Sequence, residues 1–387
     1  MYFYLQLIQT MKDYYALALE AHKKTKGKLS VKTLMPVETK EDLAIAYTPG
    51  VAAVSTAIFK DPSLAKDLTM KGRTIAVISN GTAVLGLGDI GALAGLPVME
   101  GKAILFKELG GVDAIPLVID EKDTEKFIEI VKKVSVGFGG INLEDIAAPA
   151  CFEIEKRLKE MLNIPVVHDD QHGTAIVVLA ALINALKLVN KNKEDVKIVL
   201  SGAGAAGIAI AKLLLAYGMQ NIVLCDSKGI VYEGRSDSNE YKNEIIRASK
   251  SVVSEGTIKD AIKGSDVFLG LSKPQILTPE DVSTMNKDAI IFAMANPEPE
   301  IYPEDAKKGG ARIVATGRSD FPNQINNSLA FPGLFKGALE KGLIRLDETH
   351  FMKAAIALAN AKRNPTEDAL LPDALDHSVP GIIAGAL

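Results

Sequence analysis

A glycine-rich loop lies between a short apolar run and a helical pattern in the middle of the chain. The loop Gly-Ala-Gly-Ala-Ala-Gly, Gly202 to Gly207, follows the strand-like run Val196–Leu200 and precedes the apolar stretch Ile208–Leu215. Strand, glycine loop and helix in this order are the context that a dinucleotide site requires. Gly202 permits the tight turn, Gly204 lets the backbone approach a pyrophosphate, and Gly207 lets the helix pack close to the strand.

The residues after this loop suggest which dinucleotide is bound. Ala205 and Ala206 open the helix, whose first turn offers free N–H groups to the pyrophosphate. Asp226 ends the next apolar run about 20 residues further on, where a ribose-binding carboxylate is expected. This carboxylate would repel a 2′-phosphate, although Lys228 offsets part of the repulsion. We therefore predict NAD as the preferred cofactor, with some use of NADP; an ordinary polar turn at Asp226–Gly229 is the competing interpretation.

The composition is that of a globular protein without a basic surface. Of the 387 residues, 48% are apolar and 24% are charged, and the formal net charge is −4. No basic field therefore attracts nucleic acid or an anionic membrane. Two cysteines, Cys151 and Cys225, are too few for a disulfide framework or a cysteine zinc site. The two cysteines suit a reducing cytoplasm. No uninterrupted apolar run reaches the ~18 residues that are needed to span a bilayer.

The second half of the sequence alternates strand and helix patterns after a long apolar helix, Gly173–Asn190. The predicted strands are Val196–Leu200, Ile222–Cys225, Val267–Leu269, Ala289–Met294 and Ile313–Ala315. The predicted helices between them are Ile208–Tyr217, Glu240–Ser249, Thr257–Ile262 and Pro279–Met285. This alternation predicts a doubly wound parallel sheet.

The first half mixes helix and strand, with a helix predicted at Asp13–Lys26, a strand at Thr74–Ser79 and an amphipathic helix at Cys151–Leu162. The rhythm changes after Pro165. We therefore predict an α/β protein of two domains, an N-terminal α/β domain at residues 1–165 and a Rossmann-type domain at residues 166–387.

Nine short motifs follow one another along the chain. They are Tyr47–Gly50 (YTPG), Leu85–Asp89 (LGLGD), Glu100–Lys102 (EGK), Asn142–Ile146 (NLEDI), Asp169–Ala175 (DDQHGTA), Gly202–Gly207 (GAGAAG), Ala295–Pro297 (ANP), Thr316–Asp320 (TGRSD) and Asn326–Asn327 (NN). From Tyr47 to beyond Pro332 the chain resembles the malic enzyme family in its short prokaryotic form. The resemblance implies oxidative decarboxylation of (S)-malate to pyruvate and CO2, with NAD or NADP and with Mg2+ or Mn2+. It also implies that residues 1–165 are the malic domain and that residues 166–387 bind NAD.

The resemblance implies a metal site at Glu144, Asp145 and Asp170. Three carboxylates suit a hard divalent cation and leave positions for substrate oxygens. Glu144 and Asp145 would face opposite ways on a regular strand, so both can bind one ion only if the chain turns there. Asp169 is the alternative third ligand, and the resemblance favours Asp170. The competing interpretation is an exposed acidic turn.

Lys102 and Tyr47 are the acid–base pair that the resemblance implies. Lys102 would accept the proton of the C2 hydroxyl, which requires a pKa lowered by burial or by a neighbouring cation. The apolar stretch Ala103–Phe106 is consistent with burial. Tyr47 would protonate C3 of the enolate, and the turn residues after it favour an exposed loop. A surface lysine and a half-buried tyrosine are the competing interpretations.

Two asparagines complete the expected site. Asn296 follows a buried strand, at the edge where a doubly wound sheet binds ligands, so it is expected to meet the substrate carboxylate or the nicotinamide ribose. Asn327 is a substrate residue by resemblance, with its neighbour Asn326 as the alternative. The loop Asn80–Val84 has no arginine, unlike that of long eukaryotic members. The group that binds the distal carboxylate is therefore open among Thr48, Arg73 and Ser79.

Other interpretations compete with this one. His168 and His172 flank the acidic pair, but zinc prefers a closed site of nitrogen and sulfur donors, so both histidines are expected to be scaffold. A malolactic-type enzyme would convert malate to lactate and retain the cofactor. A plain 2-hydroxy-acid dehydrogenase would use a His–Asp pair and an arginine, and a nucleotide sensor would have no catalysis.

The expected partners are malate and further copies of this chain, without nucleic acid or membrane. The apolar segments Tyr2–Ile8 and Asp13–Ala21 precede the core of the first domain. Apolar surface of this kind marks a partner interface, and closed dimers are the commonest arrangement. We therefore predict a cytoplasmic homodimer or higher homo-oligomer.

Overall fold

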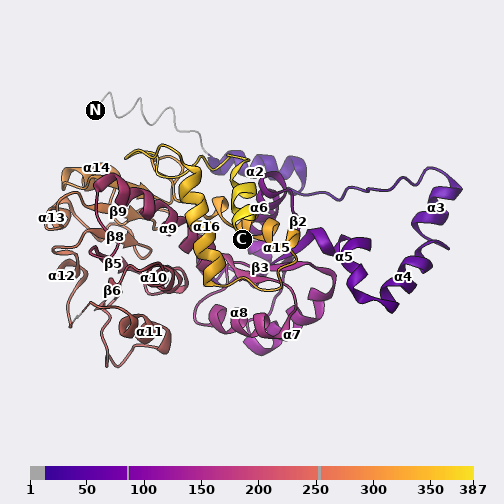
Figure 1. The fold of residues 1–387 in the computed structure, drawn as a ribbon, viewed down its shortest axis with the longest axis horizontal. Coiled ribbons are helices and arrows are strands. Elements are labelled where there is room, and N and C mark those ends of the chain that lie inside the picture. The colour runs from indigo at the N-terminus through magenta and orange to yellow at the C-terminus, as the bar shows by residue number, and fades with distance from the viewer. Residues whose placement is uncertain (1–13, 85–86, 252–253) are drawn as a thin grey trace.

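Four parallel strands form the first sheet, in the order β2-β1-β3-β4. The computed structural model describes residues 14–84, 87–251 and 254–387 (Figure 1). The strands are β1 (Thr74–Ser79), β2 (Asp113–Val118), β3 (Gly140–Leu143) and β4 (Val166–His168). The helices that join them are α6 (Ala92–Gly110), α7 (Thr124–Val134) and α8 (Ala150–Met161). Because the strands are parallel, β3 and β4 end at the same edge of the sheet.

Six strands form the second sheet, in the order β10-β9-β8-β5-β6-β7, and every neighbouring pair except β6–β7 is parallel. The strands are β5 (Lys197–Ser201), β6 (Asn221–Asp226), β7 (Gly229–Ile230), β8 (Val267–Gly270), β9 (Ile290–Ala293) and β10 (Ile313–Thr316). All five predicted strands are present, and the predicted α/β class with a Rossmann-type sheet is confirmed. The two residues of β7 are too few to give a periodic signal.

Helices cover both faces of this second sheet. They are α10 (Ala205–Tyr217), α11 (Glu240–Ala248), α12 (Ile258–Ile262), α13 (Pro279–Ser283) and α14 (Pro303–Lys308). Apolar residues of α10 join a core on one face, and those of α12, α13 and α14 form a separate core on the other. The sheet is therefore doubly wound, as predicted.

A long buried helix, α9 (Asp169–Val189), connects the two sheets. It begins at Asp169, earlier than the predicted Gly173, so the acidic pair belongs to its first turn. β4 pairs with β3 and extends the first sheet past the predicted domain boundary at residues 165 and 166.

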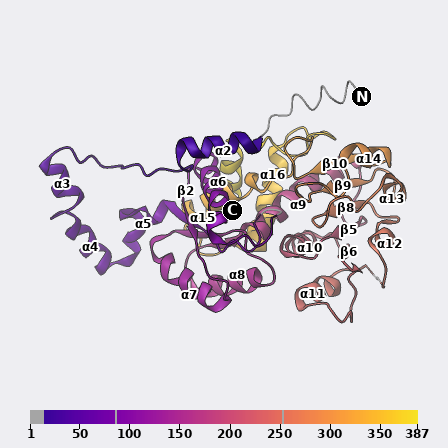
Figure 2. The ribbon, with the colours of Figure 1, turned by 180° about the vertical axis from the view of Figure 1, so that it is seen from behind.

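The last helices are α15 (Phe331–Glu340), α16 (Glu348–Ala361) and α17 (Val379–Ala386). α15 returns to α6, where the rings of Phe106 and Phe331 lie 4.6 Å apart, so the C-terminal region also supports the first sheet (Figure 2).

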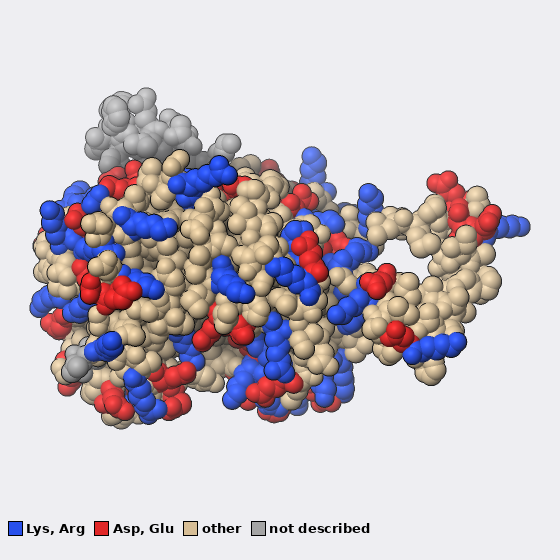
Figure 3. Space-filling view, in the orientation of Figure 1, with Lys and Arg blue, Asp and Glu red and all other residues tan. Residues whose placement is uncertain are grey.

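An arm, residues 31–61, projects from the body of the protein (Figures 1 and 2). It includes α3 (Lys40–Ala46) and α4 (Val51–Lys60), and it leads into α5 (Ala65–Leu68). No residue of the arm is buried, and Val31 and Phe59 are 96% and 87% exposed. The charges of the arm gather towards its ends, as Figure 3 shows, and residues 43–59 between them include no Lys, Arg, Asp or Glu. Such apolar exposure is typical of a surface that another molecule covers.

Within the described residues, two stretches meet the length and composition of a membrane span, Lys40–Lys60 in the arm and α9. We expected no membrane span from the sequence because we considered only uninterrupted apolar runs. These two stretches carry charged residues at their ends, so they did not meet that criterion. Most of α9 (78% of its apolar window) is buried inside the protein, which is typical of a core helix.

The N-terminal predictions fall partly outside the described residues. The helix expected at Asp13–Lys26 is α2 (Tyr14–Thr25), which has no buried residue. The segment Tyr2–Ile8 lies outside the described residues, so its predicted interface role stays a prediction.

Candidate active site

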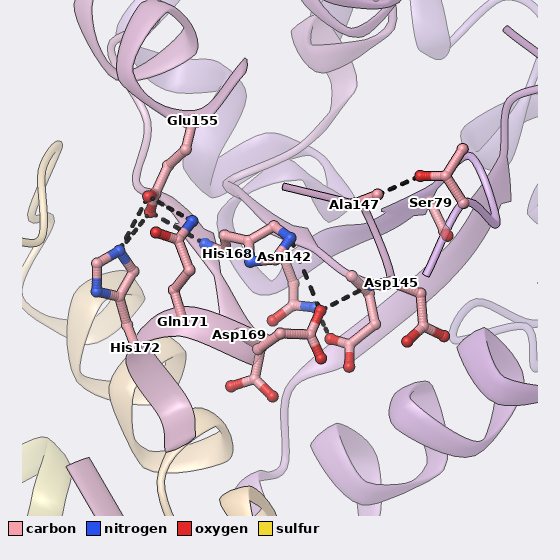
Figure 4. A network of polar contacts seen from close by, with 12 residues as sticks. Ser79, Asn142, Asp145, Ala147, Glu155, His168, Asp169, Gln171 and His172 are labelled. Carbon is pink, nitrogen blue, oxygen red and sulfur yellow. Dashed lines mark hydrogen bonds and ion pairs between the residues drawn. The ribbon is translucent and has the colours of Figure 1, made fainter. Parts of the chain in front are cut away.

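Acidic residues that directly follow β3 and β4 meet at the carboxyl edge of the first sheet (Figure 4). Asp145 has φ 53°, so the chain turns after β3 as the shared site requires. Carboxylate oxygens of Glu144, Asp145 and Asp170 all lie within 4.8 Å of one another. The backbone N–H of Asp145 donates to Asp170 Oδ2 at 2.9 Å, which ties the two loops together.

The residues present fit a divalent cation. All the donors are carboxylate oxygens, which are the ligands that Mg2+ and Mn2+ prefer. Burial raises the pKa of Glu144 to about 7 and that of Asp170 to about 6, although the charge of Lys102 lowers both pKa values; a neighbouring carboxylate adds a smaller increase in each case. A divalent cation among them would favour their ionised forms. The ligand roles stay predictions.

Lys102 lies on α6 with only 8% of its side chain exposed. Its Nζ is 2.8 Å from Glu144 Oε1 and 2.7 Å from Asp169 Oδ2, and it lies 4.2 Å from the centre of the Phe331 ring. The expected burial is present. The expected lowering of the Lys102 pKa is absent. Burial alone would lower this pKa, but the charges of Asp169 and Glu144 outweigh burial, so the pKa is raised. A base at this position therefore requires a cation that offsets those carboxylates.

Asp169 links Lys102 to Asn327. Its Oδ2 accepts hydrogen bonds from Lys102 and from Asn327 Nδ2, the latter at 2.7 Å. Burial raises the Asp169 pKa to about 7, against the opposing charge of Lys102. Sequence reasoning considered Asp169 only as an alternative metal ligand. Its place on a helical turn was the missing signal, since successive residues there point about 100° apart.

The structure also separates the two neighbouring asparagines. Asn327 reaches the site, whereas the Asn326 side chain caps a 3-10 turn by accepting the N–H of Ser328 at 2.9 Å.

A second polar network lies behind the first turn of α9 (Figure 4). Glu155 of α8 accepts the backbone N–H of His168 at 3.0 Å, His172 Nε2 at 2.9 Å and Lys159 Nζ at 2.8 Å. Although burial raises the Glu155 pKa, His172 and Lys159 hold it well below its usual range. The network fixes the helix start that carries Asp169. Sequence reasoning missed Glu155, because one acid in an amphipathic helix gives no signal.

The two histidines contribute to this scaffold. Among the described residues, the carboxylate cluster that could hold a metal includes neither His168 nor His172. Burial lowers the pKa of His168 to about 4, so it is neutral at pH 7. His172 lies within α9, because that helix begins at Asp169 and not at the predicted Gly173.

The glycine-rich loop has the geometry expected of each glycine. Gly202 has φ 118°, and a Cβ there would lie 2.7 Å from the Leu271 carbonyl oxygen. A Cβ at Gly207 would lie 1.8 Å from the Gly202 carbonyl oxygen, whereas one at Gly204 would meet no atom within 4 Å. The loop therefore leaves space at Gly204 for a close ligand. Ala205 and Ala206 begin α10, and their cofactor-binding roles stay predictions.

Asp226 and Asn296 lie at the carboxyl edge of the second sheet, where the cofactor is expected. Asp226 ends β6, and Asn296 is exposed after β9. Asp226 already contacts two cations, Arg235 and Lys242. Only Lys228 was considered as a compensating charge, because the loop that brings the others back is not readable from local sequence.

Tyr47 does not join this group within one chain. It directly follows α3 in the arm, and its side chain is 66% exposed. Both ribbon views place α3 apart from α6, which carries Lys102 (Figures 1 and 2). Of the distal-carboxylate candidates, Thr48 shares the arm, Arg73 pairs with Asp113, and Ser79 accepts the N–H of Gly81.

The chain matches two family models in order. The model described as "Malic enzyme, N-terminal domain" matches residues 24–159, and "Malic enzyme, NAD binding domain" matches residues 171–378. A solved NAD-dependent malic enzyme from Thermotoga maritima is 48% identical and has a TM-score of 0.92, with 95% of this chain and 98% of that chain covered.

Named relatives differ in cofactor. The bifunctional malic/malolactic enzyme of Bacillus subtilis is 52% identical, over 96% of this chain and 91% of its own length. The NAD-dependent malic enzyme of Geobacillus stearothermophilus is 56% identical, over 89% and 71%. The NADP-dependent malic enzyme of Escherichia coli is 53% identical over 86% of this chain, which spans 44% of that longer protein.

Proposed function

The chain belongs to the malic enzyme family, and we propose that it converts (S)-malate to pyruvate and CO2 with reduction of NAD or NADP. One observation carries the proposal: a three-carboxylate cluster lies at one sheet edge beside buried Lys102 and Asp169, and Asp169 in turn accepts a hydrogen bond from half-buried Asn327. A 2-hydroxy-acid dehydrogenase that works without a metal would not need the cluster.

Lys102 and its neighbours carry the first proton transfer. Lys102 accepts the proton of the malate C2 hydroxyl, and Asp169 and Glu144 hold its amine in place through contacts of 2.7 and 2.8 Å. Asn327 orients Asp169 through its hydrogen bond and binds a substrate carboxylate in this proposal. Asn296 binds the substrate or the nicotinamide ribose from the other sheet. When bound, NAD(P) accepts the hydride released from C2.

Glu144, Asp145 and Asp170 would hold Mg2+ or Mn2+. Such a cation would polarise the C2 oxygen, would stabilise the negative charge that forms as CO2 leaves, and would offset the carboxylates that raise the Lys102 pKa. Glu144 and Asp145 are buried and Asp170 is half-buried, and carboxylates so close together are costly without such a partner, which supports this assignment.

Tyr47 of one copy of the chain would protonate C3 of the enolate in the site of a second copy. In one chain Tyr47 lies on the exposed arm, away from Lys102, and the arm is apolar. A homodimer in which each arm covers its partner would bury this surface and would bring Tyr47 to the partner's site. Lys40–Lys60 is also long and apolar enough to cross a membrane. A membrane is therefore the alternative to a second copy of the chain as the surface that covers the arm.

A direct assay tests the function. Malate is supplied with NAD or NADP, with Mn2+ or EDTA, and reduced cofactor, pyruvate and lactate are measured together. We expect equal amounts of pyruvate and reduced cofactor, only with the metal. Lactate without net reduced cofactor would favour the malolactic activity named in the Bacillus subtilis relative. Reduced cofactor with full activity in EDTA would instead favour a plain dehydrogenase.

A further inference from the structure

Glu300 is a buried acid that has no role in the proposed reaction. It is 0% exposed and lies in the loop between β9 and α14. Its Oε2 accepts the backbone N–H of Ala295 at 3.0 Å, and its Oε1 accepts that of Ser272 at 2.9 Å. Burial raises the pKa of this carboxyl group, although the backbone N–H groups oppose that effect. Because a buried carboxyl group is costly, its two partners are the evidence for what it does.

Gly270, the last residue of β8, leaves room for the carboxyl group of Glu300. A Cβ at Gly270 would lie 2.3 Å from Glu300 Cδ and 2.6 Å from its Oε1. The φ of Gly270 is not positive, so its backbone conformation does not require glycine. The close approach of the carboxyl group therefore accounts for glycine at this position, and the two residues are matched to each other.

Glu300 connects the carboxyl ends of neighbouring strands. Ala295 follows β9 and directly precedes Asn296, whereas Ser272 follows β8. The hydroxyl of Ser272 lies 2.8 Å from that of Ser201, which ends β5 directly before the glycine-rich loop. These contacts run along the sheet edge at which a Rossmann-type domain binds its dinucleotide. One carboxyl group thus links the segment before Asn296 to the segment beside the glycine-rich loop.

The backbone is held on both sides of Asn296. Before it, the Ala295 N–H donates to Glu300, and after it, the Pro297 carbonyl accepts Arg318 Nη1 at 2.8 Å. The Asn296 side chain itself is exposed at the sheet edge. The position of this side chain therefore depends on how its neighbouring peptide units are fixed.

We propose that Glu300 is a positioning residue for Asn296, because it fixes the peptide unit that precedes the asparagine. This inference rests on the proposed function, in which Asn296 binds the substrate or the nicotinamide ribose. Glu300 is completely buried and both its oxygens are bound to backbone N–H groups, so it acts through Asn296 and does not contact the reactants.

Hydrogen exchange of the whole enzyme, measured by mass spectrometry, tests the contact itself. Glu300→Met keeps an unbranched side chain but offers no strong acceptor, so the Ala295 amide should exchange about ten-fold faster or more. Glu300→Gln keeps one acceptor oxygen and should have a smaller effect, and it takes the place of Glu300→Met if that variant does not fold. Glu304→Met is the matched control, because Glu304 is an exposed residue of α14.

Unchanged exchange of the Ala295 amide in the folded variant would overturn the proposal. This measurement needs no turnover, so it succeeds or fails independently of the proposed reaction.

A double-mutant cycle tests whether Glu300 acts through Asn296. We would measure kcat, and KM for malate and for the cofactor, in the unmodified enzyme, Glu300→Met, Asn296→Ala and the double variant. We expect both single variants to impair the same constant, by about ten-fold for Glu300→Met. Once residue 296 is alanine, Glu300→Met should change that constant by less than about two-fold.

Effects that multiply independently would overturn the positioning role and would assign Glu300 to the stability of the loop alone. Full activity of Asn296→Ala would overturn the proposed role of Asn296 and this inference together. The two failures are therefore distinguishable.

Discussion

The carboxyl edge of the first sheet and the arm hold the two members of the proposed acid–base pair in opposite settings. Lys102 is 8% exposed and is bound by carboxylates, whereas Tyr47 is 66% exposed beyond the end of α3. A buried charge must be paired within the fold, and Lys102 finds its partners, Glu144 and Asp169, in its own chain. The exposed apolar arm holds no buried charge that needs a partner within the same chain. The comparison separates what one chain builds from what a second copy would add.

The largest expected effect is at Lys102. Lys102→Ala should reduce malate oxidation and oxaloacetate reduction alike, by about 10³-fold, because both need proton transfer at the C2 oxygen. Tyr47→Phe should impair malate decarboxylation more than oxaloacetate reduction, which needs no proton at C3. Lys107→Ala is the control, because Lys107 is an exposed residue of the same helix. Equal losses in both assays for Tyr47→Phe would contradict a role confined to the enolate.

The next effect separates the two neighbouring acids on α9. Asp170→Asn should weaken Mn2+ binding by about 10-fold or more, since it removes a charged ligand, and excess Mn2+ should restore part of the activity. Asp169→Asn should bind Mn2+ nearly as well yet lose activity, because Asp169 contacts Lys102 and Asn327. Mn2+ affinity measured by calorimetry decides between them. The reverse pattern would make Asp169 the ligand.

Mixed dimers test whether the arm acts on a partner. Tyr47→Phe and Lys102→Ala chains should each decarboxylate malate poorly on their own, but together they would form one intact site in each mixed dimer if Tyr47 serves the other copy. Random pairing makes about half of the dimers mixed, so about a quarter of the unmodified activity should return after co-refolding. No recovery, with mixed dimers verified by mass spectrometry, would show that Tyr47 acts in its own chain. A monomer by sedimentation would remove the dimer altogether.

The sequence predicts the second sheet well, and physical reasons explain where it falls short elsewhere. Apolar strands such as Val267–Gly270 alternate with helices and have a clear period, whereas the pairing of β4 with β3 depends on a distant strand. The motifs grouped Glu144, Asp145 and Asp170, and the structure brings these carboxylates together because β3 and β4 are parallel and end at one edge. Local pattern does not reveal Glu155, Arg235 or Lys242, because their partners are far apart along the chain.

The smallest expected effect on activity concerns Glu155, which supports the edge from behind. Glu155→Ala leaves the N–H of His168 and the side chains of His172 and Lys159 without their shared acceptor, so it should destabilise the fold by about 3 kcal/mol. Activity at low temperature should fall only a few-fold, because Glu155 lies behind the reacting groups. Glu160→Ala, at an exposed position of α8, should change stability by less than about 0.5 kcal/mol.

Urea unfolding across pH separates the charge of Glu155 from its packing. Because its folded pKa is lowered, Glu155 stabilises the protein above its unfolded pKa of about 4.3, and this contribution is lost as pH falls further. Glu155→Gln should lack that component, so its stability should fall less steeply than that of the unmodified protein below about pH 4.3. Identical pH profiles would mean that Glu155 acts through shape alone. A large loss of activity with unchanged stability would place Glu155 among the reacting groups and would move the boundary between the site and its support.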